Sequence, residues 1–282
     1  MNPRAKPKFD EVGYWSEVKL DILEEYAKAY STILSSGRQP RFHHVYIDAF
    51  AGAGVHISKA TRKYVLGSPL NALLVEPPFK EYHFIDLDGR KVDLLKRRVG
   101  ERPDVHIHHG DCNGLLLKEV FPKVKYEEYR RALCLLDPYG LHLNWEVIRA
   151  AGQMKTIDMF LNFPVMDMNR NVLWRHPERV GEEGISRMTA FWGDSSWRKI
   201  AYTPEPTLFG DQDVKAEIPV LAAAFRERLE SVAGFKYVPK PLRMRNSVGA
   251  IVYYLFFGSP NPTGEKIANH LLRKYDKRGV RQ

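Results

Sequence analysis

The sequence predicts an α/β protein built on a mostly parallel β-sheet with helices on both faces. Between residues 43 and 163, apolar β-rich segments alternate with segments of helical periodicity. This alternation is typical of parallel sheets, because each crossover helix packs back onto the sheet. The 282 residues are 44% hydrophobic and 27% charged, so a single domain over residues 1–282 with a sizeable core is expected.

The expected elements follow in chain order. Apolar residues between Trp15 and Tyr30 recur at helical spacing, which predicts a helix within an N-terminal extension over residues 1–40. Strands are predicted at 43–48, 81–86, 104–109, 131–137 and 156–163. Helices are predicted at 69–76, 89–99, 113–121 and 144–151.

The last third of the chain departs from this rhythm. Residues 165–212, rich in Trp, Arg and Pro, predict an inserted helical cap that contacts substrate, and a helix at about 213–232 follows. Residues 234–282 predict a closing hairpin of two strands, 236–244 and 249–259, and a basic helix at 262–276.

Composition excludes several classes of protein. No apolar run approaches the roughly 18–20 residues that span a bilayer, and the N-terminus lacks a signal-peptide pattern. Cys112 and Cys134 are too few for a disulfide framework, so a reducing cytoplasm is expected. No metal site is expected at His106, His108 and His109, because neighbouring strand residues point to opposite faces.

The segment "VYIDAFAGAG", residues 45–54, predicts a buried strand that ends on Asp48 and turns through Gly52 and Gly54. Glycines in such a turn allow backbone to approach a ligand closely. A dinucleotide fits poorly. Dinucleotide-binding proteins carry the motif Gly-x-Gly-x-x-Gly at the start of a helix, whose N-terminus binds the pyrophosphate. Here Ile57 occupies the third glycine position, and the next helix signal comes only at Ser68.

S-adenosylmethionine fits the acidic strand ends better, since it carries a sulfonium and an amino group but no phosphate. Asp48 would hold the methionine end directly or through water, Asp86 would accept the ribose hydroxyls, and Asp111 would accept from the adenine amine. The predicted cofactor-binding residues are Asp48, Phe50, Gly52, Gly54, Asp86, Asp111 and Cys112.

The wider chain resembles the three-Cys-motif partner proteins, a bacterial family of predicted class I S-adenosylmethionine-dependent methyltransferases. The matching segments are "YWSEVKLDILEEYAKAY", "DAFAGAGV", "GSPLNAL", "HFIDLD", "LLDPYG" and "YYLFFGSPNPTGEKI". The resemblance implies a Rossmann-like sheet of order 3-2-1-4-5-7-6 with strand 7 antiparallel. It also implies a partner protein carrying the three-Cys motif, and closure of Trp15 and Lys19 over the cofactor.

"DPYG" at 137–140 resembles the Asp-Pro-Pro-Tyr motif of amino-methyltransferases that act on nucleobases. In that chemistry Asp137 and the Pro138 carbonyl accept from an exocyclic amine, and Tyr139 stacks on the base. Here Tyr139 stands where the motif has its second proline. The alternative interpretation is structural: Asp137 caps the following helix, and Tyr139 packs beneath the cap.

Charge predicts the partner. The chain carries a net charge of +9, and residues 234–282 hold ten Lys and Arg against two acidic residues. A concentrated basic surface is typical of binding to nucleic acid phosphates, here RNA or DNA, although a solubilising helix gives the same pattern. A cofactor-binding protein without catalysis of its own, and a methyltransferase acting on protein or small molecules, remain open.

Overall fold

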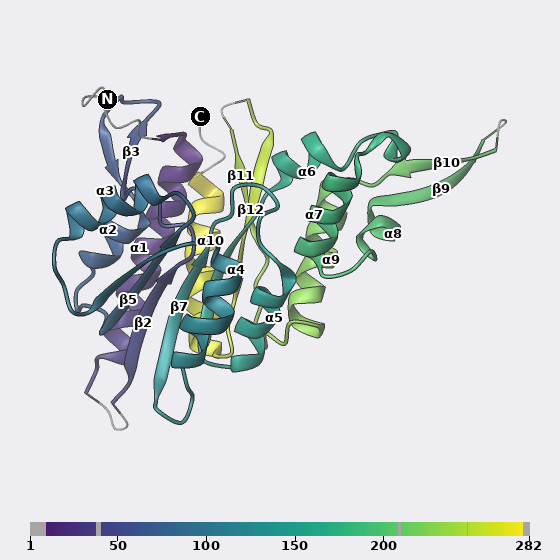
Figure 1. The fold of residues 1–282 in the computed structure, drawn as a ribbon. Coiled ribbons are helices and arrows are strands. Elements are labelled where there is room, and N and C mark those ends of the chain that lie inside the picture. The colour runs from purple at the N-terminus through teal and green to yellow at the C-terminus, as the bar shows by residue number, and fades with distance from the viewer. Residues whose placement is uncertain (1–9, 38–40, 208–209, 247, 279–282) are drawn as a thin grey trace.

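The computed structural model describes residues 10–37, 41–207, 210–246 and 248–278. Its centre is a seven-stranded sheet of order β11-β12-β8-β7-β2-β5-β6 (Figure 1). The strands are β2 (His43–Asp48), β5 (Glu81–Asp86), β6 (Val105–His109), β7 (Arg130–Leu136), β8 (Ile157–Phe163), β11 (Leu242–Arg245) and β12 (Ile251–Gly258). Numbered along the chain within this sheet, they read 3-2-1-4-5-7-6, and β12 is antiparallel to both neighbours. The predicted fold class is confirmed.

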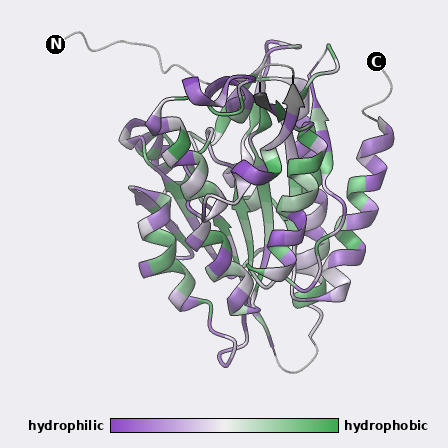
Figure 2. Ribbon diagram, turned by 90° about the vertical axis from the view of Figure 1, so that its right-hand side faces the viewer, coloured by the Kyte–Doolittle hydropathy of each residue, from purple (hydrophilic) through white to green (hydrophobic). Residues whose placement is uncertain are grey.

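Two hydrophobic cores cover the two faces of the sheet. One face packs against α1 (Tyr14–Leu34), α2 (Ser68–Leu73), α3 (Gly89–Val99) and α10 (Pro262–Arg278). The other packs against α4 (Cys112–Leu115), α5 (Trp145–Met154), α7 (Glu182–Trp192) and α9 (Ile218–Ser231). Apolar residues concentrate in the strands, and the outer helix faces are hydrophilic (Figure 2). The middle of the sheet is therefore shielded from solvent, and the polar side chains that a ligand could reach lie at the strand ends.

A small second sheet was not predicted. β1 (Glu11–Val12) pairs with β3 (Val55–Ser58), which pairs with β4 (Tyr64–Leu66). This β3–β4 hairpin fills the interval between the glycine turn and α2. It explains why the first crossover helix starts only at Ser68.

The segment 165–212 contains α6 (Val165–Asn171), α7, α8 (Trp197–Ala201) and most of a β-hairpin. The hairpin consists of β9 (Tyr202–Thr207) and β10 (Gly210–Lys215), which extend away from the sheet (Figure 1). The predicted helix at 213–232 is wrong at its start, because Asp213–Lys215 pair with β9 and α9 begins at Ile218. Pro219 suits a first helical turn, where its missing N–H is not needed.

Within the described residues, no helix has the length and apolarity needed to cross a membrane. Cys112 and Cys134 are both buried free thiols. A cytoplasmic location stays a prediction.

Candidate functional site

Two cavities open at the carboxyl ends of the parallel strands, on either side of Phe50. The first, which we call the Asp137 cavity, has a volume of about 450 Å³ and lies between the glycine turn, the start of α1 and the end of β7. The second, the Asp111 cavity, measures about 300 Å³ and lies between the ends of β2 and β6 and the cap helix α7. Phe50 lines both, so a ligand that occupies the two cavities must pass this ring.

Asp48, at the end of β2, is fully buried. Its Oδ2 accepts from Ser68 Oγ at 2.5 Å, and its Oδ1 accepts from the Phe50 N–H at 3.1 Å. Burial raises the pKa of this carboxyl to about 7, although these two hydrogen bonds oppose the rise. Asp48 lines neither of the two cavities, and its predicted hold on the methionine end, direct or through water, stays a prediction. Asp48 instead ties the glycine turn to the start of α2, and Ser68 stands between it and the Asp137 cavity.

The two glycines of the turn have different roles. Gly52 has φ +64°, and a Cβ on it would meet only His56 Cε1, at an ordinary contact distance of 4.0 Å, beside the Asp137 cavity. Gly54 has φ +79°, and its Cβ would lie 2.9 Å from Leu95 Cδ1 and 3.1 Å from Leu70 Cγ. Only Gly52 therefore gives a ligand access to backbone, whereas Gly54 allows α2 and α3 to pack closely.

Asp86, at the end of β5, is 9% exposed and lies behind the glycine turn. Its Oδ2 accepts from the Gly52 N–H at 2.8 Å and its Oδ1 from the Asp88 N–H at 2.8 Å. A carboxylate oxygen has a second acceptor position. Asp86 therefore holds the glycine turn in place, and its oxygens can still accept hydrogen bonds from two ribose hydroxyls.

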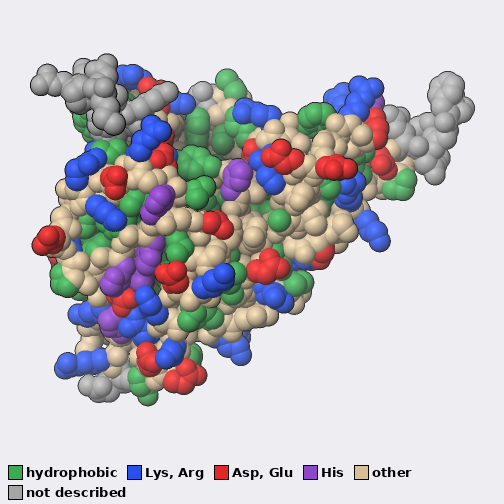
Figure 3. Space-filling model, in the orientation of Figure 1, with side chains coloured by type: hydrophobic (Ala, Val, Ile, Leu, Met, Phe, Trp, Pro, Cys, Tyr) green, Lys and Arg blue, Asp and Glu red, His purple; other side chains and the backbone are tan. Residues whose placement is uncertain are grey.

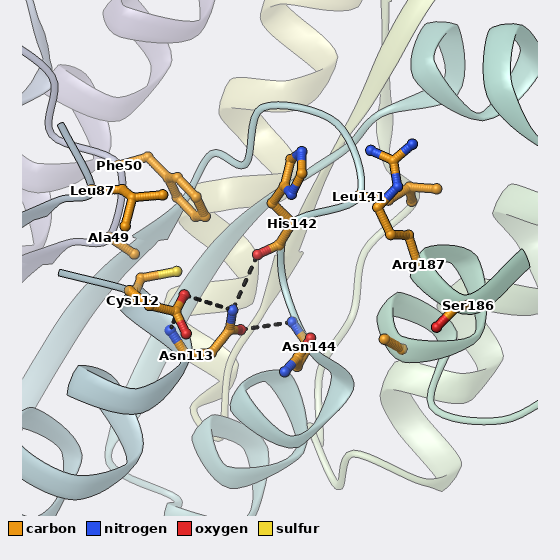
Figure 4. Close-up of a pocket in the computed structure, with 12 residues that line it drawn as sticks. Ala49, Phe50, Leu87, Cys112, Asn113, Leu141, His142, Asn144, Ser186 and Arg187 are labelled. Atoms are coloured by element: carbon orange, nitrogen blue, oxygen red, sulfur yellow. Dashed lines mark hydrogen bonds between the residues drawn. The ribbon is translucent and has the colours of Figure 1, made fainter. Parts of the chain in front are cut away.

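Asp111 and Cys112 were both predicted to bind the cofactor, and both line the Asp111 cavity. Figure 4 shows Cys112 beside Asn113 in its wall. Asp111 Oδ1 accepts from Asn113 Nδ2 at 3.0 Å, and Asn113 is held in turn by the His142 carbonyl at 3.1 Å. Burial raises the pKa of the Cys112 thiol to about 12, so it is an apolar wall rather than a nucleophile.

The Asp111 cavity combines apolar and polar walls. Phe50 and Leu87 form one side, and Leu87 is 73% exposed despite its apolar side chain. Arg187 enters from the opposite side on α7 (Figure 4). An exposed leucine beside an aromatic ring suits the faces of a flat heterocycle, and Asp111 suits its amine edge.

Asp137, after β7, is brought together with two residues from distant elements. Lys19 on α1 forms an ion pair with Asp137 Oδ2, and Asn162 Nδ2 on β8 donates to Asp137 Oδ1 at 2.9 Å. The Lys19 ammonium also lies 5.5 Å from the centre of the Tyr253 ring. The carboxylate is thus held by a cation on one oxygen and an amide on the other, and it faces the Asp137 cavity with Pro138 and Tyr139.

Several buried polar atoms at the Asp137 cavity have no hydrogen-bond partner among the residues that the structure describes. They include Asn162 Oδ1, Asp167 Oδ2 and His56 Nδ1. An unpartnered buried acceptor costs about 1–3 kcal/mol. Asn162 is only 9% exposed and its amide nitrogen is already used, so its oxygen is a preformed acceptor for an N–H or O–H of a ligand.

Tyr139 is 60% exposed at the mouth of the Asp137 cavity. Its hydroxyl donates to Asp10 Oδ2 at 3.2 Å, and Lys91 Nζ lies 5.1 Å from its ring centre. Burial raises the pKa of Asp10, but the hydrogen bond and charge of Lys91 outweigh burial and leave it lowered. The ring predicted to stack on a base is therefore at the entrance, held by the segment that precedes α1.

The charged side chains that line the Asp137 cavity are mostly acidic. The described residues that line it include four carboxylates, Asp10, Glu11, Asp137 and Asp167, against one lysine or arginine, Lys19. This balance disfavours a pyrophosphate and favours a ligand with a cationic centre or many donors. It is the opposite of what a dinucleotide needs.

Sequence reasoning left several lining residues out of the predicted site. Ser68 was noticed only as a helix start, and His56 lies on a hairpin that was not predicted. Asp167 and Arg187 belong to the cap, where no local motif distinguishes them. Lys19 was expected near the cofactor from the resemblance, and Asn162 lies in the predicted strand 156–163, but nothing in the sequence joined either of them to Asp137.

The comparisons with known proteins concern the fold. No family model and no curated protein matches the chain. A solved structure from Legionella pneumophila is 12% identical over 94% of both chains, with a TM-score of 0.48. A putative S-adenosylmethionine-dependent methyltransferase from Listeria monocytogenes is 11% identical, covers 83% of this chain and 97% of its own, and gives 0.39. A putative methyltransferase from Thermobifida fusca is 11% identical, covers 86% and 81%, and also gives 0.39.

At these identities, and with TM-scores below 0.5, these likenesses assign neither a family nor residue roles. The observed sheet order is the one that the resemblance to class I methyltransferases implied. Membership of the three-Cys-motif partner family, and a partner protein carrying that motif, stay predictions.

Proposed function

We propose that this protein transfers a methyl group from S-adenosylmethionine to a nitrogen of a nucleobase in RNA or DNA. The observation that supports this most is the position of Asp137. It lies at the end of the fourth sheet strand, in an acid-lined cavity, beside the unpartnered Asn162 oxygen.

The residues present fit S-adenosylmethionine. The Asp137 cavity would take the cationic methionine end near Gly52 and Ser68, and Lys19 is the cation available to its carboxylate. Asp86 would accept from the ribose diol, with Phe50 bordering the sugar. The Asp111 cavity would take the adenine between apolar walls. This division uses both cavities and two of the acidic strand ends, Asp86 and Asp111.

When bound, S-adenosylmethionine supplies an electrophilic methyl group on a sulfonium that leaves as a neutral thioether. The protein must then position a nitrogen lone pair in line with that methyl group and accept its N–H groups. Asp137 and Asn162 Oδ1 offer two acceptors of this kind, and the Pro138 carbonyl a third. Holding both reactants in one geometry supplies most of the expected rate.

The basic residues would hold nucleic acid near this rim. β11 and β12 form an arm whose tip extends beyond the carboxyl ends of the strands (Figure 1). Arg243 and Arg245 are exposed along it, and α10 returns toward the same end with Arg273 and Lys277 exposed. Arg281 lies outside the described residues. Such a set would neutralise phosphates on the strand that presents the base.

A second function is favoured by one observation. The Lys19 ammonium already pairs with Asp137, so the acceptor that catalysis needs is occupied in this conformation. A partner-dependent protein that binds the cofactor without catalysis would keep this pair intact.

Two measurements test the proposal. Calorimetric titration should give saturable binding of S-adenosylmethionine but not of NADH. Asp86→Ala should weaken this binding, whereas Asp93→Ala, an exposed acid on α3, should not. Transfer of a labelled methyl group should then be measured on RNA, single-stranded DNA, duplex DNA and a protein mixture.

The outcomes distinguish nucleobase methylation from protein methylation and from cofactor binding without catalysis. Labelling of RNA or DNA that Asp137→Ala abolishes supports nucleobase methylation. Labelling of protein alone contradicts the substrate class. Cofactor binding without any transfer favours the binding protein, and no binding to the folded chain contradicts the cofactor.

A further inference from the structure

A cluster of histidines and one glutamate lies at the amino ends of the strands, at the opposite end of the sheet from both cavities of the candidate site. Its members start or flank three neighbouring strands: His43 begins β2, Glu81 begins β5, and Arg130 begins β7. His83 on β5 pairs in register with His106 on β6. Histidine side chains gather on this part of the surface among Lys and Arg (Figure 3).

Three ligand-type atoms converge within this cluster. Glu81 Oε1, a ring nitrogen of His83 and a ring nitrogen of His106 all lie within 4.8 Å of one another. His83 Nε2 is 2.7 Å and His106 Nε2 is 3.8 Å from Glu81 Oε1, and the two rings stack with centres 4.9 Å apart. Ligands around a tetrahedral Zn²⁺ ion are separated by about 3.3 Å, a value these two distances bracket.

The surrounding hydrogen bonds orient the three atoms. His83 Nδ1 lies 3.0 Å from His108 Nε2. If His83 donates from Nδ1, its Nε2 presents a lone pair toward Glu81 Oε1, and two lone pairs at 2.7 Å require a cation or a proton between them. Arg130 holds the other Glu81 oxygen, Oε2. Partners of this kind, which fix ring orientation and carboxylate position, are typical of metal sites.

The site also has an entrance. His83 is buried at 1% exposure, whereas the His106 side chain is 44% exposed. An open cavity of about 620 Å³ reaches Glu81 from the side of Lys123 and Arg130. Arg130 occupies Glu81 Oε2, so Oε1 is the oxygen left for a metal.

We infer that Glu81, His83 and His106 form a binding site for a divalent transition-metal ion, with Zn²⁺ the best match. Two neutral imidazoles and a carboxylate are a known ligand set for this ion, and the remaining coordination position would hold water. Because the ligands join β6, the edge strand, to β5, the ion would fasten the edge of the sheet. The inference is independent of methyl transfer.

The test uses the full-length protein and Zn²⁺ in competition with a chromogenic chelator. We expect one Zn²⁺ per chain, and we expect His106→Ala and His83→Gln each to weaken binding at least tenfold. His109→Ala is the matched control, because His109 lies on the same strand but bonds to the Leu87 carbonyl, away from the cluster. It should leave the affinity unchanged.

A second readout guards against loss of folding in the buried His83 variant. Zn²⁺ should raise the Tm of the wild type and of His109→Ala, and it should leave the Tm of His106→Ala unchanged. Equal Zn²⁺ uptake by wild type and His106→Ala, or uptake lost only in His109→Ala, would overturn the site. The cluster would then be a hydrogen-bond network alone.

Discussion

Lys19 and Asp137, 118 residues apart in the sequence, form an ion pair across the Asp137 cavity. The Lys19 side chain is 9% exposed and that of Asp137 is 26% exposed. The pair therefore joins the N-terminal helix to the end of β7 in a partly desolvated place. Any ligand that uses the Asp137 carboxylate must share it with Lys19 or displace Lys19.

Substituting both partners should reveal this coupling. Asp137→Asn should lower methyl transfer about 100-fold or more, since the anionic acceptor that stabilises developing positive charge becomes a neutral amide. Lys19→Met should lower it less. The double variant should be far from additive, with a coupling of about 0.5–3 kcal/mol. Additive effects on kcat/KM, with folding checked by circular dichroism, would mean that the two residues act separately.

The orphan oxygen of Asn162 gives a separate prediction. Asn162→Ala removes both the acceptor and the amide that holds Asp137, so we expect methyl transfer to fall about 10- to 100-fold, matching the cost of an unmade buried hydrogen bond. Affinity for S-adenosylmethionine, measured by calorimetry, should change little. Asn113→Ala, in the other cavity, is the contrasting variant. It should weaken cofactor binding through Asp111. A reversed pattern would mean that the two cavities have exchanged roles.

Nucleic acid binding should depend on salt and on the exposed arm. Arg243→Gln combined with Arg245→Gln should weaken RNA binding and lower the slope of log K against log salt by about 1 per lost contact. Arg97→Gln, exposed on α3, is the control. Fluorescence anisotropy at several salt concentrations measures both the affinity for RNA and its salt dependence. Binding that ignores salt would contradict a phosphate-holding surface.

Buried Asp158 predicts a pH effect on stability. It accepts from Tyr26 at 2.6 Å and from Ser259, and burial raises its pKa from 3.8 to about 6. Between pH 4 and 6 the folded chain therefore binds more protons here than the unfolded chain, so this carboxyl lowers the free energy of unfolding as pH rises. Asp158→Asn should remove that dependence.

The comparison isolates Asp158, because His44 and His108, whose pKa values burial lowers to about 4, contribute equally to both proteins. The difference in unfolding free energy between variant and wild type should shift by about 2.4 kcal/mol in favour of the variant from pH 4 to 7. Urea denaturation across this range measures it. Parallel pH profiles would contradict the raised pKa.

Most of the sheet was predictable because its signals are local. β2, β5, β7 and β8 are short, mostly apolar runs bounded by turn residues, which is the pattern of a buried strand. The β3–β4 hairpin escaped prediction because "VHIS" and "YVL" are short and half-exposed. The start of α9 was misplaced because a pairing with β9, not local propensity, decides the structure of Asp213–Lys215.

The sequence by itself determined the α/β class, the strand order through its resemblance, and the acidic residues at one rim. Tertiary structure decided what those residues do. It buries Asp48 behind Ser68, and it uses Gly54 for close packing between α2 and α3. It also brings Lys19 and Asn162 into contact with Asp137. It also assembles Glu81, His83 and His106. The physical reason is that periodicity fixes which face a side chain takes, whereas burial and pairing between distant segments depend on how whole elements pack.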